Sequence, residues 1–472
     1  MRKTKIICTV GPATDKKEIL REMMLSGMDV ARFNFSHATY DEHEKRMNMI
    51  KELRQELNLP IATMLDTKGP EIRLGIFKDN KPVEVFEGDS YVLTTDEVEC
   101  DNRRASISFK GLPFDVSVGT KILINDGLVM MQVDSIAGND INCTVIDGGT
   151  LSNNKGVNVP NVTLSMPYLS DRDMSDLEFG AKNGFDFIAA SFVRNAADVD
   201  YLRKFSHSLG WREVRIVAKI ENTDGVKNID EIIEAADGIM IARGDLGVEI
   251  PFEQIPAIQK NIISKAYNAG KQVITATQML ESMISNPRPT RAEITDVANA
   301  IYDGTSATML SGETAAGTHP VDAVKTMALI AETTENDINY FNRFKKRSSD
   351  ENKTVTNAIS HATVTTAHDL GAKAIITVTK TGTTARMISK FRPVSPIIGC
   401  TTSETVCRQL NLSWGVIPLM CDEKENTDEL FDHAIDVAHK NGYIDKNDLV
   451  VITAGIPLGI SGTTNMLKVH QL

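Results

Sequence analysis

Eight short apolar segments recur along the chain, and most of them are followed by one amphipathic segment with helical spacing, such as 41–57 or 256–270. The eight segments are 5–12, 29–37, 61–70, 185–193, 214–222, 238–245, 271–279 and 306–314. Strands that are apolar along nearly their whole length and alternate with helices are typical of a parallel sheet covered by helices. Eight such units that close on themselves form a (β/α)8 TIM barrel, so the repeat predicts this α/β fold.

The repeat is interrupted once, between the third and fourth apolar segments. Residues 70–166 alternate apolar and polar side chains between Gly, Asn and Asp turns, which predicts a small antiparallel β-barrel inserted as a lid over the mouth of the larger barrel. After the charged linker 342–353, strands alternate with helices again, which predicts an open α/β domain. The expected domains are a catalytic barrel of 1–69 and 167–341, a lid of 70–166 and a C-terminal regulatory domain of 342–472.

Charge and composition exclude several classes of protein. The net charge of −12 argues against nonspecific binding to nucleic acid or to an anionic membrane surface. The six cysteines are scattered without metal-ligand spacing, and no apolar run approaches the ~20 residues of a membrane helix. The N-terminal apolar run is too short for a signal peptide. We therefore expect a soluble, cytoplasmic protein in which any anionic ligand is bound by a local cluster of cations or metal ions.

Polar side chains follow nearly every one of the eight apolar segments, at the point where the strand is expected to end. They are Arg32, Asn34, Ser36, Asp66, Thr67, Ser191, Lys219, Glu221, Arg243, Asp245, Thr277, Gln278, Ser311 and Glu313. The carboxyl ends of the strands of a (β/α)8 barrel surround one mouth, and the active sites of such folds are built there. The sequence therefore predicts that these scattered side chains meet in one site.

Two carboxylates and a lysine define the chemistry that this site could support. Glu221 and Asp245 supply two hard oxygen ligands from adjacent strands, which is how Mg²⁺ is usually bound, although each could instead pair with its neighbour Lys219 or Arg243. A protonated Lys219 beside a metal ion would stabilise a phosphoryl group or an enolate. The alternative, a Schiff-base nucleophile, requires a depressed pKa, which the surrounding carboxylates disfavour.

Other strand-end residues suit anions and a monovalent cation. Arg32 and Arg73 could bind phosphate oxygens or form ordinary surface ion pairs. The glycine at 244 lets backbone N–H groups approach an anion. The oxygens of Asn34, Ser36, Asp66 and Thr67 could bind a monovalent cation, although Ser and Asn at strand ends more often cap turns.

Nine motifs follow one another along the chain: CTVGPAT, ARFNFSH, LDTKGPEIR, NKGVNVP, KIEN, MIARGDLGVEI, TATQMLESM, PTRAE and MLSGETAAG. In this order they resemble the pyruvate kinase family, and the resemblance covers essentially the whole chain. It implies transfer of the phosphoryl group of phosphoenolpyruvate to ADP, giving pyruvate and ATP in glycolysis, with Mg²⁺ (or Mn²⁺) and K⁺ as cofactors. It also implies a homotetramer that ends at Leu472 without the extra phosphohistidine-like domain of some bacterial members.

The resemblance also implies roles for individual residues. Glu221 and Asp245 resemble the Mg²⁺ ligands, and Lys219 resembles the residue that stabilises the phosphoryl group in flight. Substrate contacts are implied for Arg32, Lys219, Gly244, Asp245 and Thr277, with Thr277 near the enolate that must be protonated. The K⁺ site is implied at Asn34, Ser36, Asp66 and Thr67, and nucleotide contacts at Asn34, Arg73 and Lys155. Glu71 stands where members that require K⁺ tend to have Glu.

Two turns rich in Ser, Thr and Gly, 379–386 and 455–465, follow apolar strands of the C-terminal domain. Such turns can bind a phosphate through backbone N–H groups, while N-capping of a helix by Thr383 or Thr384 is the simpler alternative. Their position matches the family's effector site, which implies allosteric control by a sugar phosphate or nucleotide. The candidate residues are Thr379, Thr381, Gly382, Thr383, Thr384, Ser461, Gly462 and Thr463.

Two other functions stay open from the residues alone. A metal-dependent or Schiff-base aldolase acting on pyruvate uses the same fold, but it needs neither the lid nor the Asn34, Ser36, Asp66 and Thr67 set. A non-catalytic sugar-phosphate sensor would use the C-terminal domain, but all the polar residues expected at the barrel mouth are present.

Overall fold

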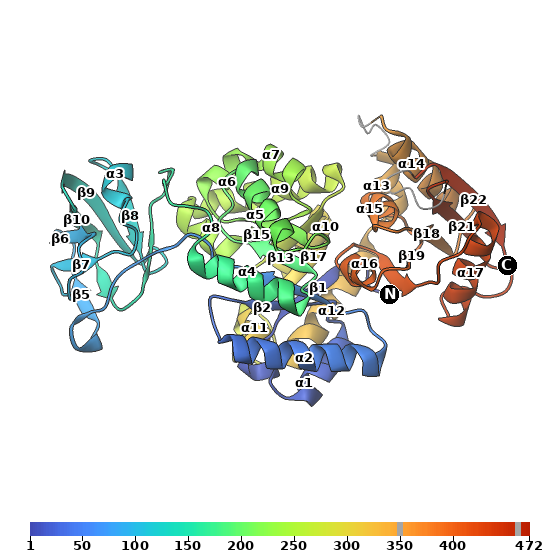
Figure 1. The fold of residues 1–472 in the computed structure, drawn as a ribbon, viewed down its shortest axis with the longest axis horizontal. Coiled ribbons are helices and arrows are strands. Elements are labelled where there is room, and N and C mark those ends of the chain that lie inside the picture. Colours follow the sequence, from blue (N-terminus) through green and yellow to red (C-terminus); the bar gives the residue numbers. More distant parts are fainter. Residues whose placement is uncertain (347–352, 458–463) are drawn as a thin grey trace.

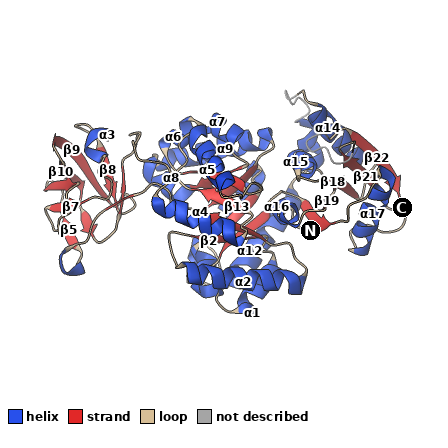
Figure 2. Ribbon diagram, viewed as in Figure 1, coloured by secondary structure: helices blue, strands red, loops and turns tan. Residues whose placement is uncertain are grey.

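The computed structural model describes residues 1–346, 353–457 and 464–472, and it shows three bodies in a row (Figure 1). A barrel covered by helices lies in the centre, with a small body rich in strands on one side and an α/β body on the other (Figure 2). Within these described ranges, no helix has both the length and the apolar character needed to cross a lipid bilayer.

The central body is a closed barrel of eight parallel strands, as the sequence repeat predicted. The strands are β1 (Lys5–Thr9), β2 (Val30–Asn34), β3 (Ala62–Asp66), β13 (Phe187–Ala190), β14 (Arg215–Ile220), β15 (Gly238–Ala242), β16 (Gln272–Ala276) and β17 (Ala307–Leu310). Their order around the barrel is β1-β17-β16-β15-β14-β13-β3-β2, and the barrel closes where Lys5 of β1 pairs with Ala307 of β17. The lid insertion separates β3 from β13 in the sequence, but the two strands pair side by side.

Helices cover the outside of the barrel, and capping boxes fix where several of them begin. The helices and 3₁₀ turns are η1 (Pro12–Thr14), α1 (Lys17–Ser26), α2 (Tyr40–Leu57), α4 (Asp171–Asn183), α5 (Ala196–Ser208), α6 (Thr223–Lys227), α7 (Ile229–Ala235), α8 (Arg243–Glu249), η3 (Phe252–Gln254), α9 (Ile255–Ala269), η4 (Glu281–Ile284), α10 (Arg291–Asp303), α11 (Gly312–Ala315) and α12 (Pro320–Asp337). At the start of α2, Thr39 accepts from the N–H of Glu42, whose carboxylate accepts from the N–H of Thr39. Apolar helix residues then pack on outward-facing strand residues such as Phe33 and Leu65.

The inserted lid is a mainly antiparallel sheet that curls on itself. Its strands are β4 (Ile72–Arg73), β5 (Val83–Val85), β6 (Ser90–Thr94), β7 (Arg104–Ser106), β8 (Lys121–Ile124), β9 (Val129–Ala137), β10 (Asp140–Asp147), β11 (Gly149–Leu151) and β12 (Gly156–Asn158), with η2 (Lys78–Asn80) and α3 (Leu112–Asp115) between them. Seven strands run β4-β12-β8-β9-β10-β6-β7, and β11 pairs with β5 apart from them. The expected small antiparallel barrel is confirmed as a curled sheet: β7 is short and parallel to β6, and a single bridge between Leu74 and Ile107 joins the two edges of the sheet.

The C-terminal body is an open α/β sheet. It comprises α13 (Tyr340–Lys346), α14 (Val355–Asp369), β18 (Ala374–Val378), α15 (Thr383–Lys390), β19 (Ile397–Thr401), α16 (Glu404–Leu410), β20 (Val416–Met420), α17 (Thr427–Lys440), β21 (Leu449–Ala454) and β22 (Met466–Gln471). The strand order is β20-β19-β18-β21-β22, and only the edge strand β22 is antiparallel to its neighbour among the described strands of this sheet. The prediction of an open α/β domain is confirmed.

The segment that follows α16 closes the floor of the barrel. Leu412 is fully buried and belongs to the apolar cluster formed by the inward-facing residues of the barrel strands. Just before it in the chain, Asn411 donates to the carbonyl of Pro60 (2.8 Å) and Gln409 donates to the carbonyl of Glu213 (2.7 Å), close to where β3 and β14 begin. The C-terminal domain therefore covers the amino ends of the strands, and the lid lies on the opposite side of the barrel (Figure 1).

Replacing Leu412 by Ala should destabilise the protein, because it leaves a cavity in the barrel floor that its neighbours cannot fill. We expect the free energy of unfolding to fall by about 2–5 kcal/mol, the usual range for a buried Leu→Ala change. Urea denaturation followed by fluorescence measures this change. Leu329→Ala on α12 is the matched control, since Leu329 is 65% exposed and its loss should have little effect. An unfolding curve of Leu412→Ala that overlays the wild-type curve would show that the floor does not depend on this side chain.

Candidate active site

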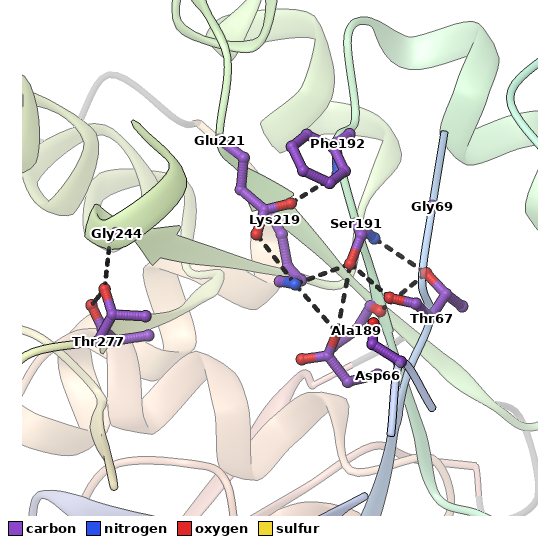
Figure 3. Close-up of polar contacts among 12 residues, drawn as sticks. Asp66, Thr67, Gly69, Ala189, Ser191, Phe192, Lys219, Glu221, Gly244 and Thr277 are labelled. Atoms are coloured by element: carbon purple, nitrogen blue, oxygen red, sulfur yellow. Dashed lines mark hydrogen bonds and ion pairs between the residues drawn. The ribbon is translucent and has the colours of Figure 1, made fainter. Parts of the chain in front are cut away.

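A buried lysine lies at the centre of the barrel mouth (Figure 3). The ammonium of Lys219, near the end of β14, lies 3.0 Å from Asp66 Oδ1, 2.7 Å from Ser191 Oγ and 2.9 Å from Glu221 Oε1. Asp66 ends β3, Ser191 directly follows β13 and Glu221 directly follows β14, and these three strands are neighbours in the barrel. The ammonium donates hydrogen bonds to Asp66 and Ser191, whereas its contact with Glu221 is an ion pair in which Oε1 accepts no hydrogen bond from any residue that the structure describes.

Lys219 and Asp66 stabilise each other in their charged forms. Burial alone would lower the pKa of Lys219, but the carboxylates of Asp66 and Glu221 outweigh burial and raise this pKa above its ordinary value. Burial also opposes ionisation of Asp66, yet Arg32, whose Nε lies 2.6 Å from Asp66 Oδ2, and Lys219 hold the pKa of Asp66 below its ordinary value. Arg32 is fixed in turn by Thr9, whose hydroxyl accepts from Nη1 at 2.9 Å. A lysine held protonated in this way can stabilise negative charge but cannot act as a neutral nucleophile.

Glu221 is the second buried carboxylate of the mouth. Burial raises its pKa to about 7, because the attraction of Lys219 is partly offset by the carboxylates of Asp245 and Asp66. Its Oε2 accepts from the N–H of Phe192 at 2.7 Å, which fixes the side chain towards the mouth. Burial, helped by the two neighbouring carboxylates, thus outweighs the attraction of Lys219.

Asp245 reaches the same region from a helix rather than from a strand. It lies in the first turn of α8 and is exposed, which differs from the strand position expected for it. The neighbour-pair alternative holds for Glu221, which pairs with Lys219, but Arg243 pairs with Asp296 (Nη1 to Oδ2, 2.6 Å). No group of three or more His, Cys, Asp and Glu side chains in the described parts of the chain forms a metal site by itself. Two carboxylates with additional water and substrate ligands fit Mg²⁺, which keeps much of its hydration.

The four oxygen-bearing residues expected to bind a monovalent cation lie at one corner of the mouth. Asn34 and Asp66 are paired neighbours on β2 and β3, and Asn34 Oδ1 accepts from the N–H of Ser36 at 3.1 Å. Thr67 follows Asp66, and its carbonyl accepts from the hydroxyl of Ser191 at 2.6 Å. The set of one amide, one carboxylate, hydroxyl and carbonyl oxygens is suited to a monovalent cation, which would share Asp66 with the positive side chains already bound to it.

A buried histidine packs against the loop that carries Asn34 and Ser36. His43 of α2 is buried and stacks on Phe35, with ring centroids 4.3 Å apart, and its Nε2 lies 3.1 Å from the carbonyl of His37. Phe35 lies between Asn34 and Ser36, so this packing holds the loop that carries both residues. Burial lowers the pKa of His43 to about 4, which keeps the imidazole neutral near pH 7.

Thr277 lies two strands away from Lys219, directly after β16. Its hydroxyl accepts from the N–H of Gly244 at 2.8 Å and donates to the carbonyl of Ala276 at 2.5 Å (Figure 3). Both Thr277 and the next residue, Gln278, have left-handed backbone conformations, with φ of +67° and +53°. Thr277 and Gly244 therefore form one unit at the edge of the mouth, joined by a backbone donor and a side-chain hydroxyl.

A cleft of about 160 Å³ separates the lid from the barrel mouth. Lid residues Arg73 and Gly156 line it together with Asp245 and Asn222 of the barrel. Arg73 is held at its entrance by Glu71 (Nη2 to Oε2, 2.7 Å) and by the carbonyl of Asn154. Lys155 directly precedes Gly156, which pairs with Arg73. The structure thus places both cationic lid residues beside this cleft, apart from the buried group around Lys219.

The candidate effector residues of the C-terminal domain lie around the start of α15. The helix begins after Gly382, which has a φ of +77°, and it has no side-chain cap, so capping by Thr383 or Thr384 is not observed. The hydroxyl of Thr383 lies 3.0 Å from that of Thr381, and the hydroxyl of Thr384 lies 2.8 Å from that of Thr464. Thr379 is buried after β18. Ser461, Gly462 and Thr463 lie outside the described residues.

Two residues that contribute to the mouth, Thr9 and Asp296, had not been assigned to the site from the sequence. Ser191 was recognised as a strand-end residue, and its contacts with Lys219 and Thr67 required the barrel register. Thr9 supports Arg32 from β1, and Asp296 supports Arg243 from α10. No local sequence signal marks the last two, because each acts on a residue far away in the chain.

Comparison with known proteins relates the whole chain to one family. Residues 1–324 match the family model "Pyruvate kinase, barrel domain", and residues 357–470 match "Pyruvate kinase, alpha/beta domain". The chain is 51% identical to the pyruvate kinase of Clostridium acetobutylicum, covering all of this chain and 99% of that one, and 49% identical to that of Geobacillus stearothermophilus, of which it covers 80%. It is also similar to the crystal structure of a Cryptosporidium parvum pyruvate kinase, with a TM-score of 0.94, 40% identity and coverage of 100% and 96%.

The buried His43 predicts how the stability of the protein depends on pH. Its pKa is about 4 when folded and near 6.5 when exposed, so the unfolded chain binds more protons between these values, and stability falls as the pH falls. His43→Gln keeps a donor for the carbonyl of His37 and cannot be protonated. Between about pH 6 and pH 5, its free energy of unfolding should therefore fall less than that of the wild type, by roughly 1 kcal/mol per pH unit.

Urea denaturation at several pH values measures this difference. His37→Gln is the control, because His37 is exposed and its removal should leave the pH dependence unchanged. Parallel pH profiles for the wild type and His43→Gln would contradict the assignment of a buried, neutral imidazole.

Proposed function

The chain belongs to the pyruvate kinase family, its reaction is phosphoryl transfer from phosphoenolpyruvate to ADP, and we propose that Lys219 is the residue that stabilises the phosphoryl group during transfer. One observation carries this proposal: the Lys219 ammonium is buried at the barrel mouth and is kept protonated by Asp66 and Glu221. Phosphoryl transfer needs positioning and charge stabilisation more than covalent help from the protein. The same protonated state argues against imine chemistry of the aldolase type.

The contacts of Lys219 indicate how it would receive the substrate. Its ammonium donates to Asp66 and Ser191 and forms an ion pair with Glu221, so a phosphoryl oxygen would take the place of one of these three groups. Glu221 is the group best suited to leave, because its Oε1 accepts no hydrogen bond from the described residues and it would also serve as a metal ligand. Asp66 stays in place through Arg32.

We propose Glu221 and Asp245 as the ligands of Mg²⁺ or Mn²⁺, and Asn34, Ser36, Asp66 and Thr67 as the ligands of K⁺. When bound, the divalent cation would act as a Lewis acid on the oxygens of the transferring phosphoryl group. Substrate and nucleotide are polyanions while the protein has a net charge of −12, so bound cations and the local positive side chains must supply the attraction.

The remaining residues of the mouth have roles that follow from their positions. Arg32, fixed between Asp66 and Thr9, presents a rigid guanidinium beside the ammonium and would bind the phosphate of phosphoenolpyruvate. The unit of Gly244 and Thr277 would bind the carboxylate end of the substrate. The hydroxyl of Thr277 is placed to take part in protonating the enolate that remains after the phosphoryl group has left.

The cleft below the lid is the proposed site of ADP. Arg73 and Lys155 approach it from the lid, and Asn34 would contact the nucleotide from the barrel side. Closure of the lid would bring these cations to the nucleotide phosphates and exclude water, which favours transfer to ADP over hydrolysis.

We also propose that the turn formed by Thr379, Thr381, Gly382, Thr383 and Thr384 binds the phosphate of a sugar-phosphate or nucleotide effector. The absence of a side-chain cap on α15 supports this, because the N–H groups at the start of the helix remain available to an anion. The proposal extends to a cytoplasmic homotetramer whose chains are divided into the barrel (1–69 and 167–341), the lid (70–166) and the regulatory domain (342–472).

Lys219→Met tests the central proposal. Met keeps the length and apolar stem of the lysine but removes the charge, so turnover should fall by at least roughly 10²–10³-fold. Pyruvate formation from phosphoenolpyruvate and ADP with Mg²⁺ and K⁺ measures it. Lys204→Met, a change of the same kind at an exposed position of α5, should retain wild-type turnover. Turnover of Lys219→Met within about threefold of the wild type would exclude the proposed role.

Glu71 and the K⁺ set predict how turnover depends on the monovalent cation. The wild type should turn over at least about tenfold faster in K⁺ than in Na⁺ at equal ionic strength, and Glu71→Lys should reduce this ratio because a fixed ammonium replaces the charge of the bound ion. Glu87→Lys, an equal change of charge at an exposed lid position, is the control and should keep the wild-type ratio. Equal rates in K⁺ and Na⁺ for the wild type would remove the K⁺ proposal and leave the kinase activity untouched.

A further inference from the structure

Thr277 and Gln278 adopt a backbone conformation that their side chains do not favour. Both residues have positive φ, +67° and +53°, and Thr is β-branched, so its Cβ substituents crowd the backbone in the left-handed region. Such a conformation persists only where surrounding contacts impose it. Here it turns the Thr277 hydroxyl towards Gly244 N, the contact that builds the edge of the mouth.

The contacts that impose this conformation come from one side chain. Arg243, at the start of α8, donates to consecutive carbonyls of the loop after β16: Nη2 lies 2.7 Å from the carbonyl oxygen of Thr277 and 3.2 Å from that of Gln278, and Nε lies 3.3 Å from that of Ala276. A guanidinium is a planar fork with five donors, so it can bind several carbonyls at fixed relative positions. Arg243 therefore fixes the relative positions of the carbonyl groups in this loop.

The guanidinium is itself held by a carboxylate from another helix. Both oxygens of Asp296 on α10 lie near Arg243 Nη1, at 2.6 and 2.9 Å, and the Arg243 side chain is only 11% exposed. Because a largely buried cation needs a counter-charge, Asp296 fixes where Arg243 can lie. The chain of contacts runs from α10 through Asp296 and Arg243 to the backbone of Thr277.

We propose that Arg243 and Asp296 are positioning residues for the reaction, acting through the backbone of Thr277 to place its hydroxyl and the N–H of Gly244 at the barrel mouth. The inference rests on the role proposed above for Thr277 in the reaction. It assigns a task to Arg243 that differs from the pairing with Asp245 considered from the sequence. Neither side chain needs to touch the substrate for this task.

A double-mutant cycle distinguishes positioning from a general contribution to folding. Arg243→Lys keeps the positive charge beside Asp296 but cannot bind three carbonyls in one plane. We expect its kcat to fall about 10- to 100-fold, as for a displacement of about 1 Å at a reacting group, with the KM for phosphoenolpyruvate changed less than about threefold. In a Thr277→Val background the same change should cost less than about threefold, because the hydroxyl it positions is already gone.

Two further measurements keep the test independent of activity and of folding failure. The amide of Gly244 donates to Thr277, so its hydrogen exchange, followed in a peptide of residues 242–250, should be faster in Arg243→Lys than in the wild type. Asp296→Asn is the substitute variant if Arg243→Lys does not fold. It keeps the size and one acceptor of the carboxylate, and it should show the same changes in kcat and in hydrogen exchange to a smaller degree. The matched control is Arg203→Lys, because Arg203 also binds a carboxylate (Asp237) and a carbonyl (Ala235), but near the floor of the barrel.

Wild-type kcat and unchanged exchange at Gly244 in Arg243→Lys would overturn the inference. So would an equal loss of kcat in the two backgrounds, or an equal loss in Arg203→Lys, since either result would assign the effect to the fold and not to Thr277. If Thr277→Val alone kept full turnover, the proposed role of Thr277 would fail together with the inference. That outcome is distinguishable from failure of the inference alone, in which Thr277→Val loses turnover and Arg243→Lys does not.

Discussion

The barrel mouth depends on one ammonium placed between two buried carboxylates. Asp66 and Glu221 come from strands that are far apart in the sequence, and in the closed barrel both lie within 3.0 Å of Lys219 Nζ. Without the ammonium, two negative charges would face each other in a region of low polarity, and one of them would bind a proton. The geometry of three strand ends is thus fixed by charge as well as by backbone pairing, and Glu221 Oε1 is left without a hydrogen bond from the described residues.

The two halves of the mouth are held by different physical means. Around Lys219, ion pairs and hydrogen bonds between side chains set the positions, and the backbone contributes through the N–H of Phe192 and the carbonyl of Thr67. Around Thr277, by contrast, one side chain, Arg243, binds the backbone, and the backbone then positions the hydroxyl. The first arrangement can adjust when charge enters the site, since acceptors can be exchanged. The second is rigid, which would suit the role proposed for the Thr277 hydroxyl.

Much of this structure could be predicted from the sequence, for identifiable reasons. The eight apolar segments predicted the closed barrel because a parallel sheet is buried on both faces, and the strand-end positions of Lys219 and Glu221 predicted that they would point into one mouth. The alternating pattern of the lid predicted its curled antiparallel sheet, but the parallel direction of β7 was not predicted, because contacts and not composition set it. Asp245 belongs to the first turn of a helix, where its position depends on how α8 leaves β15. The link from Asp296 to Thr277 has no sequence signal, since it joins three segments only in space.

Because Leu412 fills the floor of the barrel, the inner apolar layer of the barrel is complete only after part of the C-terminal domain has been synthesised. The strands that surround Leu412 begin at residues as early as Lys5 and Val30, yet the floor that covers them is made only when the chain has been synthesised past α16. During translation, the barrel can pair its eight strands while its inner apolar layer is still open to water at one end. Exposed apolar surface of this kind promotes association between incomplete chains, so the order of synthesis leaves an interval in which the nascent protein needs protection. A fragment that ends before Leu412 would leave the floor of the barrel open permanently, although it contains every residue assigned to catalysis.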